Sequence, residues 1–250
     1  MDANVIFILW KRQLKRYFRS RSRMIGSVAQ PLLFLLAFGF GFSSVFQQAG
    51  QGNYFQFLTP GIVSMAILFT SIFTGIEIIW DRQFGFLKET LVAPVSRLDI
   101  MIGKTLGGAT VASLQGFIVI GISLLVGFVP YSLIMVPVAF AFMFLIATLF
   151  AAIGTAIASL LEDMQGFQLI MNFFVMPIFF LSGALFPLEG LPEVVGIISK
   201  VNPLSYGVDG IRSALTGVSY FGFAVDFAVL GVSTAVCLAV GSYLFSKMQI

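Results

Sequence analysis

Six long apolar runs constrain this chain more than any other feature of its sequence. Each approaches or exceeds the roughly 20 residues that an α-helix needs to cross the hydrocarbon of a bilayer. Because lipid offers no partner to backbone polar groups, such runs predict helices. We therefore expect an all-α integral membrane protein whose six transmembrane helices lie at Ile25–Phe46, Leu58–Trp80, Thr105–Phe128, Leu133–Leu161, Leu169–Phe186 and Phe221–Ser246.

The composition also places the chain in lipid. Hydrophobic residues make up 58% of it and charged residues only 10%, whereas soluble domains are about 25% charged. A core in water could not hide so much apolar surface. We expect a multi-pass protein of the cell membrane, with residues 1–24 outside the spans and residues 25–250 forming one membrane domain.

Few residues in this chain could carry out catalysis. It contains no histidine, the commonest general base and zinc ligand. Its single cysteine, Cys237, allows no disulfide within the chain and no cysteine-based metal site. Gly103-Lys104-Thr105 resembles the end of a phosphate-binding loop, but Leu98 stands where that loop needs a glycine. We therefore expect a non-catalytic chain that holds neither a metal nor a cofactor.

The distribution of basic residues predicts which way the chain crosses the membrane. Cytoplasmic loops carry an excess of Lys and Arg. If both termini are cytoplasmic, twelve basic residues lie inside and two, Lys200 and Arg212, lie outside. A nucleic-acid-binding arm is another interpretation of the first seven, but they lead directly into a span, so we expect no nucleic-acid partner. The inside residues are Lys11, Arg12, Lys15, Arg16, Arg19, Arg21, Arg23, Arg82, Lys88, Arg97, Lys104 and Lys247.

The N-terminal segment has the pattern of an amphipathic helix. Trp10, Leu14 and Phe18, with Phe7 and Tyr17, recur at spacings of three and four and share a face. Most of the basic residues, including Lys11 and Lys15, lie on the opposite face. Such a helix lies in the membrane interface. It either only anchors the chain to lipid or also docks a cytoplasmic partner.

A charged segment at residues 81–104 separates the second and third apolar runs. Gly85 and Pro94 interrupt it, and Ser96 with Asp99 forms an approximate capping box for the next helix. The pattern predicts an elbow of two helices, with Phe84 and Leu87 available to insert into a groove on a partner. The alternative is a plain loop lying on lipid head groups.

Three polar features lie at or beyond the ends of the spans. Glu77, Arg82 and Asp226 are structural or gating candidates, because ionisable groups near a bilayer are costly. We expect Glu77 to pair with Arg82 or Lys104, and Asp226 to face head groups. We also expect Lys104 to extend to the interface.

Residues 187–220 are apolar but broken by prolines, which favours re-entrant helices on the outer side over a compact cap.

A series of short motifs runs along nearly the whole chain. They are Gln30-Pro31-Leu32, Pro60-Gly61, Gly75-Ile76-Glu77-Ile78-Ile79-Trp80-Asp81-Arg82-Gln83-Phe84-Gly85, Leu91-Val92-Ala93-Pro94-Val95-Ser96-Arg97, Gly103-Lys104 and Asn202-Pro203-Leu204-Ser205-Tyr206-Gly207-Val208-Asp209-Gly210-Ile211-Arg212. Together they resemble the type-2 ABC exporter permeases, including the drug-resistance and Nod-factor export permeases. The chain departs from that pattern at Gln83, where the family usually has glutamate.

The resemblance implies a role for each segment. A permease of this kind dimerises, with a second copy or a related chain, and binds two copies of a separate ABC ATPase that holds ATP and Mg²⁺. The N-terminal helix becomes the interface helix, with Trp10, Lys11, Leu14, Lys15 and Phe18. The elbow becomes the coupling helix, and the residues that would couple it to the ATPase are Phe84, Gly85, Leu87, Lys88, Glu89, Ala93, Pro94 and Arg97.

The function that the resemblance implies is export driven by ATP hydrolysis on the partner. The many phenylalanines suit an amphipathic drug, a lipid or a lipid-linked glycan, and the sequence does not choose among them. A stand-alone secondary transporter or channel is the alternative; it predicts buried ion sites and often inverted repeats, and the sequence shows neither clearly. A purely structural membrane protein is a second alternative.

Overall fold

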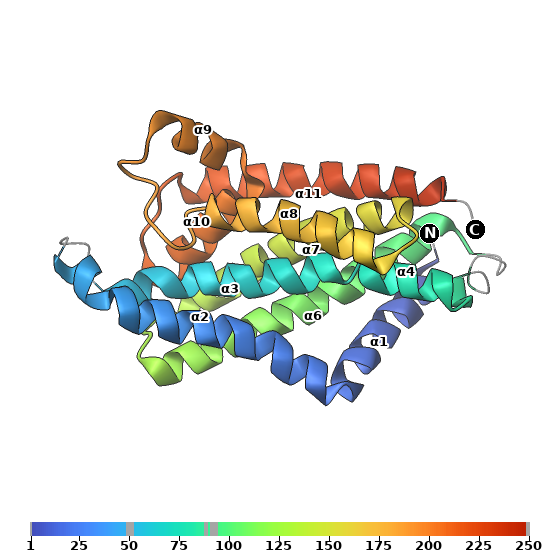
Figure 1. Cartoon of the computed structure of the whole chain (residues 1–250), viewed down its shortest axis with the longest axis horizontal. Helices are drawn as coiled ribbons and strands as arrows, with labels where there is room; N and C mark the ends of the chain where they lie inside the picture. Colours follow the sequence, from blue (N-terminus) through green and yellow to red (C-terminus); the bar gives the residue numbers. More distant parts are fainter. Residues whose placement is uncertain (1, 49–52, 88–89, 91–94, 249–250) are drawn as a thin grey trace.

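The computed structural model describes residues 2–48, 53–87, 90 and 95–248. The described residues form helices and connecting turns, with no strand among them. The helices run mostly along one long axis (Figure 1). They are α1 (Ala3–Arg19), α2 (Arg21–Gln48), α3 (Tyr54–Phe73), α4 (Ile76–Gln83), α6 (Arg97–Val126), the 3₁₀ turn η1 (Leu133–Met135), α7 (Val136–Leu160), α8 (Met164–Phe180), α9 (Glu193–Val201), α10 (Pro203–Thr216) and α11 (Phe223–Ser246).

The structure confirms an all-α membrane protein with several apolar spans. Five helical segments in the described residues are long and apolar enough to cross a bilayer: Met24–Gln48, Tyr54–Gln83, Arg97–Val126, Leu133–Leu160 and Phe223–Ser246. The fifth predicted span, Leu169–Phe186, corresponds to α8, which is apolar but has only 17 residues. Since a helix rises 1.5 Å per residue, α8 is about 26 Å long, slightly less than the ~30 Å hydrocarbon core. The number of six spans stays a prediction.

Helix α3 forms the centre of the bundle. It packs against α2, α6, α7 and α10, and most of its side chains are buried. Small residues allow this close approach: a Cβ at Gly154 on α7 would collide with the carbonyl oxygen of Ile72 on α3. By contrast, α2 and α11 bury little of their surface within the chain. Their apolar side chains therefore face lipid or another protein.

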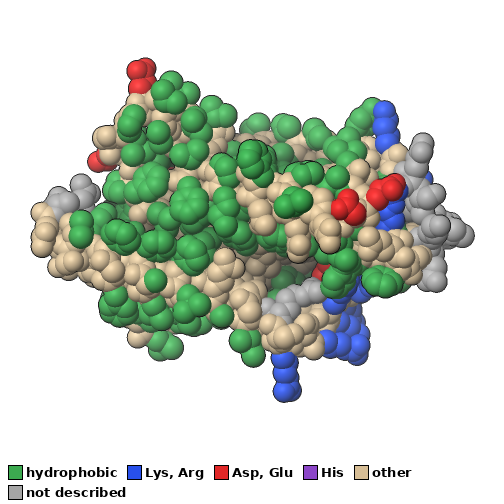
Figure 2. Space-filling view, in the orientation of Figure 1, with side chains coloured by type: hydrophobic (Ala, Val, Ile, Leu, Met, Phe, Trp, Pro, Cys, Tyr) green, Lys and Arg blue, Asp and Glu red, His purple; other side chains and the backbone are tan. Residues whose placement is uncertain are grey.

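The two ends of the bundle differ in composition. Both described chain ends lie with α1 and α4 at one end, which we call the terminal end (Figure 1). Lys and Arg side chains gather there, while hydrophobic side chains cover the middle of the molecule (Figure 2). The opposite end, with α9 and α10, is called the distal end. Helix α10 packs on α3, α7 and α11, whereas α9 projects from the bundle (Figure 1).

Helices α1 and α2 form a V, in which α1 lies toward the terminal end and α2 runs away from it along the bundle (Figure 1). Only Ser20, whose backbone is not helical, separates them. Asp2 begins α1 by accepting a hydrogen bond from the backbone N–H of Asn4. Helix α1 then packs along α6. The predicted N-terminal amphipathic helix is therefore present, and it is attached to the bundle as well as exposing an outer surface.

Candidate functional site

Asp81, near the end of α4, joins three helices at the terminal end. Its carboxylate accepts two hydrogen bonds from the guanidinium of Arg12 on α1, at 3.0 and 3.2 Å. It also accepts one from the ammonium of Lys104 on α6. Arg16, one turn after Arg12, lies 3.9 Å from Asp81 and 3.7 Å from Glu77. We call Arg12, Arg16, Glu77, Asp81 and Lys104 the ion cluster.

One predicted position in this region, that of the Lys104 side chain, is wrong. Lys104 is only 5% exposed and binds Asp81 instead of extending to the interface, because α1 covers this part of α6. Glu77 has the guanidinium of Arg16 3.7 Å away, and its charge also interacts with the Lys104 ammonium. Arg82 forms an ion pair with Glu162 at 2.9 Å. All of these partners are far from one another in sequence, so spacing along the chain could not reveal them.

Two glycines of α6 let the interface helix approach closely. A Cβ at Gly103 would lie 2.9 Å from the Cβ of Leu9, and one at Gly107 would lie 2.6 Å from the Cγ of Gln13. The indole N–H of Trp10 donates to the hydroxyl of Thr110 at 3.0 Å. Trp10 is therefore part of the contact with α6. Leu14 is half-buried, while Lys11, Lys15 and Phe18 are exposed and remain available to lipid or to a partner.

The elbow that follows α4 presents one large apolar side chain. Phe84 is 81% exposed. The next residue, Gly85, has a φ of +78°, a conformation that favours glycine. Leu87, which the sequence offered to a partner, is 0% exposed and belongs to the core. Lys88, Glu89, Ala93 and Pro94 lie outside the described residues.

The elbow is fixed to the rest of the chain on both sides. The ring of Phe86 lies 3.7 Å from the Arg12 guanidinium, a cation–π contact. Ser96 caps α6 by accepting from the N–H of Asp99, as the sequence predicted. Arg97 donates to the carbonyl oxygens of Ser246 and Met248 at 2.6 and 2.9 Å. Arg97 therefore holds the end of α11 and is not a free surface cation.

Different interactions hold the distal end. Arg212 on α10 is buried, donates to the carbonyl of Gly183 at 2.8 Å and stacks 4.1 Å over Phe57. Burial lowers the pKa of Arg212 to about 10, against the opposing charge of Asp209. Asp209 accepts from the hydroxyl of Ser219 and from the N–H groups of two following residues, Tyr220 and Phe221.

Asp226 is the second buried acid of the distal end. It lies in the first turn of α11 and is 0% exposed. The prediction that it faces head groups is therefore wrong. The chain folds α10 against α11 at this point and encloses the carboxyl.

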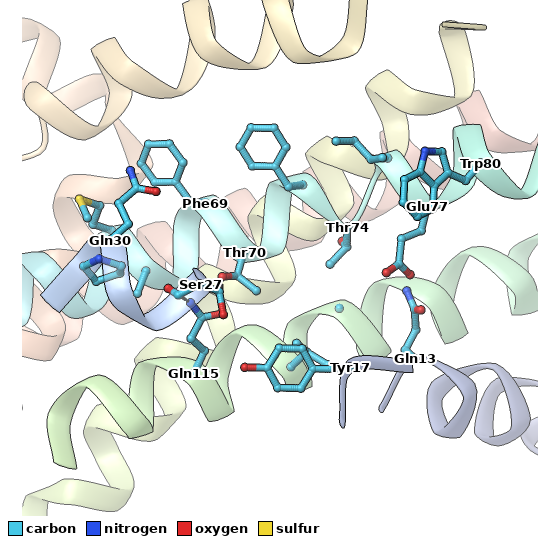
Figure 3. Close-up of a pocket in the computed structure, with 17 residues that line it drawn as sticks. Gln13, Tyr17, Ser27, Gln30, Phe69, Thr70, Thr74, Glu77, Trp80 and Gln115 are labelled. Atoms are coloured by element: carbon cyan, nitrogen blue, oxygen red, sulfur yellow. Dashed lines mark hydrogen bonds between the residues drawn. The ribbon is translucent and has the colours of Figure 1, made fainter. Parts of the chain in front are cut away.

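A cavity of about 380 Å³ lies between α1 and the spans, next to the ion cluster. Helices α1, α2, α3, α4 and α6 all line it (Figure 3). Its polar lining includes Gln13 and Gln115, which the sequence analysis did not name, and Tyr17 and Gln30, which it named only as parts of the N-terminal helix and of a motif. The only signal in the sequence was that Gln30 and Gln115 interrupt apolar runs.

Comparison with known families decides the identity of the fold. The family described as "ABC-2 type transporter" matches residues 4–216, which includes the elbow, the ion cluster and α10. The chain belongs to the ABC-2 type transporter family. The sequence-based resemblance is thus confirmed. Membership makes the chain a multi-pass membrane permease of an ABC transporter, a non-catalytic subunit.

Relatives of this ABC-2 family chain match it over most of its length. It is 32% identical to transport permease ycf38 of Cyanophora paradoxa, over 97% of this chain and 88% of that protein. It is 27% identical to Nodulation protein J of Rhizobium leguminosarum bv. trifolii, over 84% and 78% of the two chains. It is 25% identical to the inner membrane transport permease YadH of Escherichia coli, over 90% and 88%.

Within this ABC-2 permease the predicted site residues and the partners of Asp81 form three groups. The interface-helix residues and Phe84, Gly85 and Arg82 gather at the terminal end. Asp226 lies at the distal end. The basic partners of Asp81 form the group that sequence reasoning missed, because their pairing depends on how α1 folds back onto α6.

Proposed function

We propose that this chain is the permease of an ATP-driven exporter whose motor binds at the terminal end. Two copies of a separate ABC ATPase would hold ATP and Mg²⁺. A second copy of this chain, or a related permease, would complete the membrane part. Both termini would then lie in the cytoplasm, with the chain in the cell membrane, as the positive-inside rule favours.

The observation that carries the proposal is the attachment of an exposed elbow to an ion cluster. Phe84 projects into solvent directly after α4. On the same helix, Asp81 binds α1 through Arg12 and α6 through Lys104. A partner that displaces Phe84 would therefore move α4, α6 and the interface helix together. Coupling requires such contacts to differ between two states of the motor.

Exposed apolar surface supports both a second permease chain and contact with lipid. Leu33 and Phe40 on α2 and Leu169 and Phe173 on α8 are exposed in the single chain. The Phe-rich composition suits an amphipathic drug, a lipid or a lipid-linked glycan as the exported molecule. Two of the similar proteins are named as transport permeases and one as a nodulation protein. A stand-alone transporter or channel finds no support beside the family match.

Replacing Phe84 tests where the motor binds. We expect Phe84→Asp to abolish co-purification of the ATPase and ATP-dependent transport, because a charge replaces an exposed apolar contact. Leu160→Asp is the control, since Leu160 is an exposed apolar residue at the end of α7. The measurement is ATPase activity in the detergent eluate of each tagged permease. Full ATPase recovery with Phe84→Asp would refute a docking role for the elbow.

A further inference from the structure

The cavity beside the interface helix has two unlike walls. One wall is apolar and comes from α2 and α3; it consists of Pro31, Met65, Ala66, Phe69 and Phe73. The opposite side carries hydroxyl and amide groups: Gln13, Tyr17, Ser27 and Gln115, together with Thr70 of α3, which donates a hydrogen bond to Gln115 (Figure 3). Its volume of about 380 Å³ falls within the ~300–1,000 Å³ of small-molecule sites. The division suits a molecule with an apolar body and a polar head.

One hydroxyl in the cavity has no partner among the described residues. Tyr17 is 3% exposed, and its Oη makes no hydrogen bond there. Its side chain lines the cavity, with the hydroxyl directed toward the side occupied by Gln115 (Figure 3). Buried hydroxyl groups are normally hydrogen-bonded. A ligand atom in the cavity would give this hydroxyl the partner that it lacks.

The charges around the cavity favour an uncharged head group. Among the described residues Glu77 is the one charged side chain in the lining, and the guanidinium of Arg16 lies 3.7 Å from the Glu77 carboxylate. A charged head group that moved from water into the cavity would find no further counter-ion in the described lining. Burying an unpaired charge in this way costs free energy. Amide and hydroxyl side chains instead match neutral donors and acceptors such as sugar hydroxyls.

The position of the cavity points to the membrane as the source of its ligand. Most of its lining comes from the spans α2, α3 and α6. Gln30 lines it and is exposed, on a span whose other exposed side chains are largely apolar. Interface helix α1 borders the same space through Gln13 and Tyr17. A molecule dissolved in the bilayer could enter here beside α2.

We propose that this cavity binds a membrane amphiphile with an apolar body and an uncharged, hydrogen-bonding head group, and that the Tyr17 hydroxyl contacts the head. This inference goes beyond the proposed function, because the binding needs neither ATP nor a motor. The ligand is either the transported molecule or a resident lipid of the same chemistry. The two sources differ in their effect on the motor.

Trp80 offers a direct measurement of binding, since it lines the cavity. The chain has two tryptophans, so Trp10→Phe leaves Trp80 as the single tryptophan, which is excited selectively at a wavelength that tyrosine no longer absorbs. The full chain is placed in phosphatidylcholine nanodiscs and titrated with a dodecyl glucoside that carries bromine on its tail. We expect saturable quenching of Trp80 that unbrominated dodecyl glucoside reverses. Quenching that rises without saturation, as from the bulk lipid, would overturn the proposal.

Single substitutions then locate the site. Tyr17→Phe removes a hydroxyl that no described residue binds, so we expect the fold to persist and the Kd to rise about three- to tenfold, as for one hydrogen bond. Tyr243→Phe, at an exposed position of α11, should leave the Kd unchanged. Ser27→Phe should fill the cavity and remove saturable quenching, whereas Ser44→Phe, exposed on the same helix, should not. Wild-type binding by both Tyr17→Phe and Ser27→Phe would refute the assignment.

Two further arms test the head group and the source. Brominated dodecyl phosphate and dodecyltrimethylammonium should bind more weakly than the glucoside; equal or tighter binding would refute the uncharged-head specificity. In the complex with the ATPase, stimulation by dodecyl glucoside that Ser27→Phe removes would identify a transported ligand, and binding without stimulation a resident lipid. If no ATPase joins the permease, the proposed function fails while the nanodisc titration still decides the site.

Discussion

The terminal and distal ends of this permease are held together in different ways. At the terminal end, charged side chains from α1, α4 and α6 meet one another, with Asp81 shared between Arg12 and Lys104. At the distal end, buried charged groups bind mainly backbone: Arg212 a carbonyl, and Asp209 two N–H groups. Ion pairs between helices can exchange partners when helices shift, whereas bonds to backbone fix one local fold. We therefore expect the ion cluster of the terminal end to rearrange during transport and the distal end to hold its shape.

The strongest test of this comparison is to remove the centre of the ion cluster. Asp81→Asn leaves the buried ammonium of Lys104 without its counter-ion. Breaking a buried pair by removing one partner costs about 3–5 kcal/mol. We expect a loss of that size in the free energy of unfolding, measured by SDS titration in mixed micelles, together with loss of ATP-driven transport.

Glu162→Gln is the matched control for Asp81→Asn. Glu162 also pairs with an arginine, Arg82, but its side chain is exposed. Exposed ion pairs contribute about 0–1 kcal/mol. A cost for Glu162→Gln as large as that for Asp81→Asn would show that burial does not distinguish the two pairs.

Loss of a charged side chain at the distal end should lower the free energy of unfolding and leave binding of the ATPase unchanged. Arg212→Met removes the hydrogen bond to Gly183 and the stacking on Phe57. We expect a loss of about 2–3 kcal/mol, since a hydrogen bond to a charged group contributes about 1.5–3 kcal/mol. The same SDS titration measures it, and co-purification of the ATPase should be unchanged. Loss of the ATPase from a stably folded Arg212→Met permease would contradict the division between the two ends.

The smallest expected effect concerns the turn of the elbow. Gly85→Ala introduces a Cβ into open space but at a φ of +78°, so the cost is backbone strain of about 1–2 kcal/mol. Gly41→Ala is the control, because its Cβ also meets no neighbouring atom and its backbone is helical. We expect weaker ATPase binding only for Gly85→Ala. Equal affinities of the two variants, measured by titration of the ATPase, would mean that the turn's conformation does not matter.

The sequence predicted the elements of this fold more accurately than their contacts. Run length and hydropathy located the spans, and Ser96 marked the start of α6, because these signals are local. The partners of Asp81 and the burial of Leu87 depend on the return of α1 onto α6 and on the path of the elbow. Such contacts join residues distant in the sequence, so no pattern of spacing specifies them.

The cavity, too, could not be predicted from spacing along the sequence. Gln30 and Gln115 were visible as polar interruptions of apolar runs, but a single polar residue in a span has many possible partners. The break in the helix at Ser20 brings Gln13 and Tyr17 of α1 against the spans. The cavity that Gln30 and Gln115 share is enclosed as a result. The location of the site follows from that one bend.

The first turn of α6 has a consequence for how force would spread through the chain. The side chain of Asp99 accepts from the backbone N–H of Asp2, while Arg97, two residues earlier, binds the carbonyls of Ser246 and Met248. The residue that begins α1 and the residues at the end of α11 are thus both tied to one turn of α6. A displacement of that turn would therefore be transmitted to α1 and to α11 at the same time, although these two helices lie at opposite ends of the sequence.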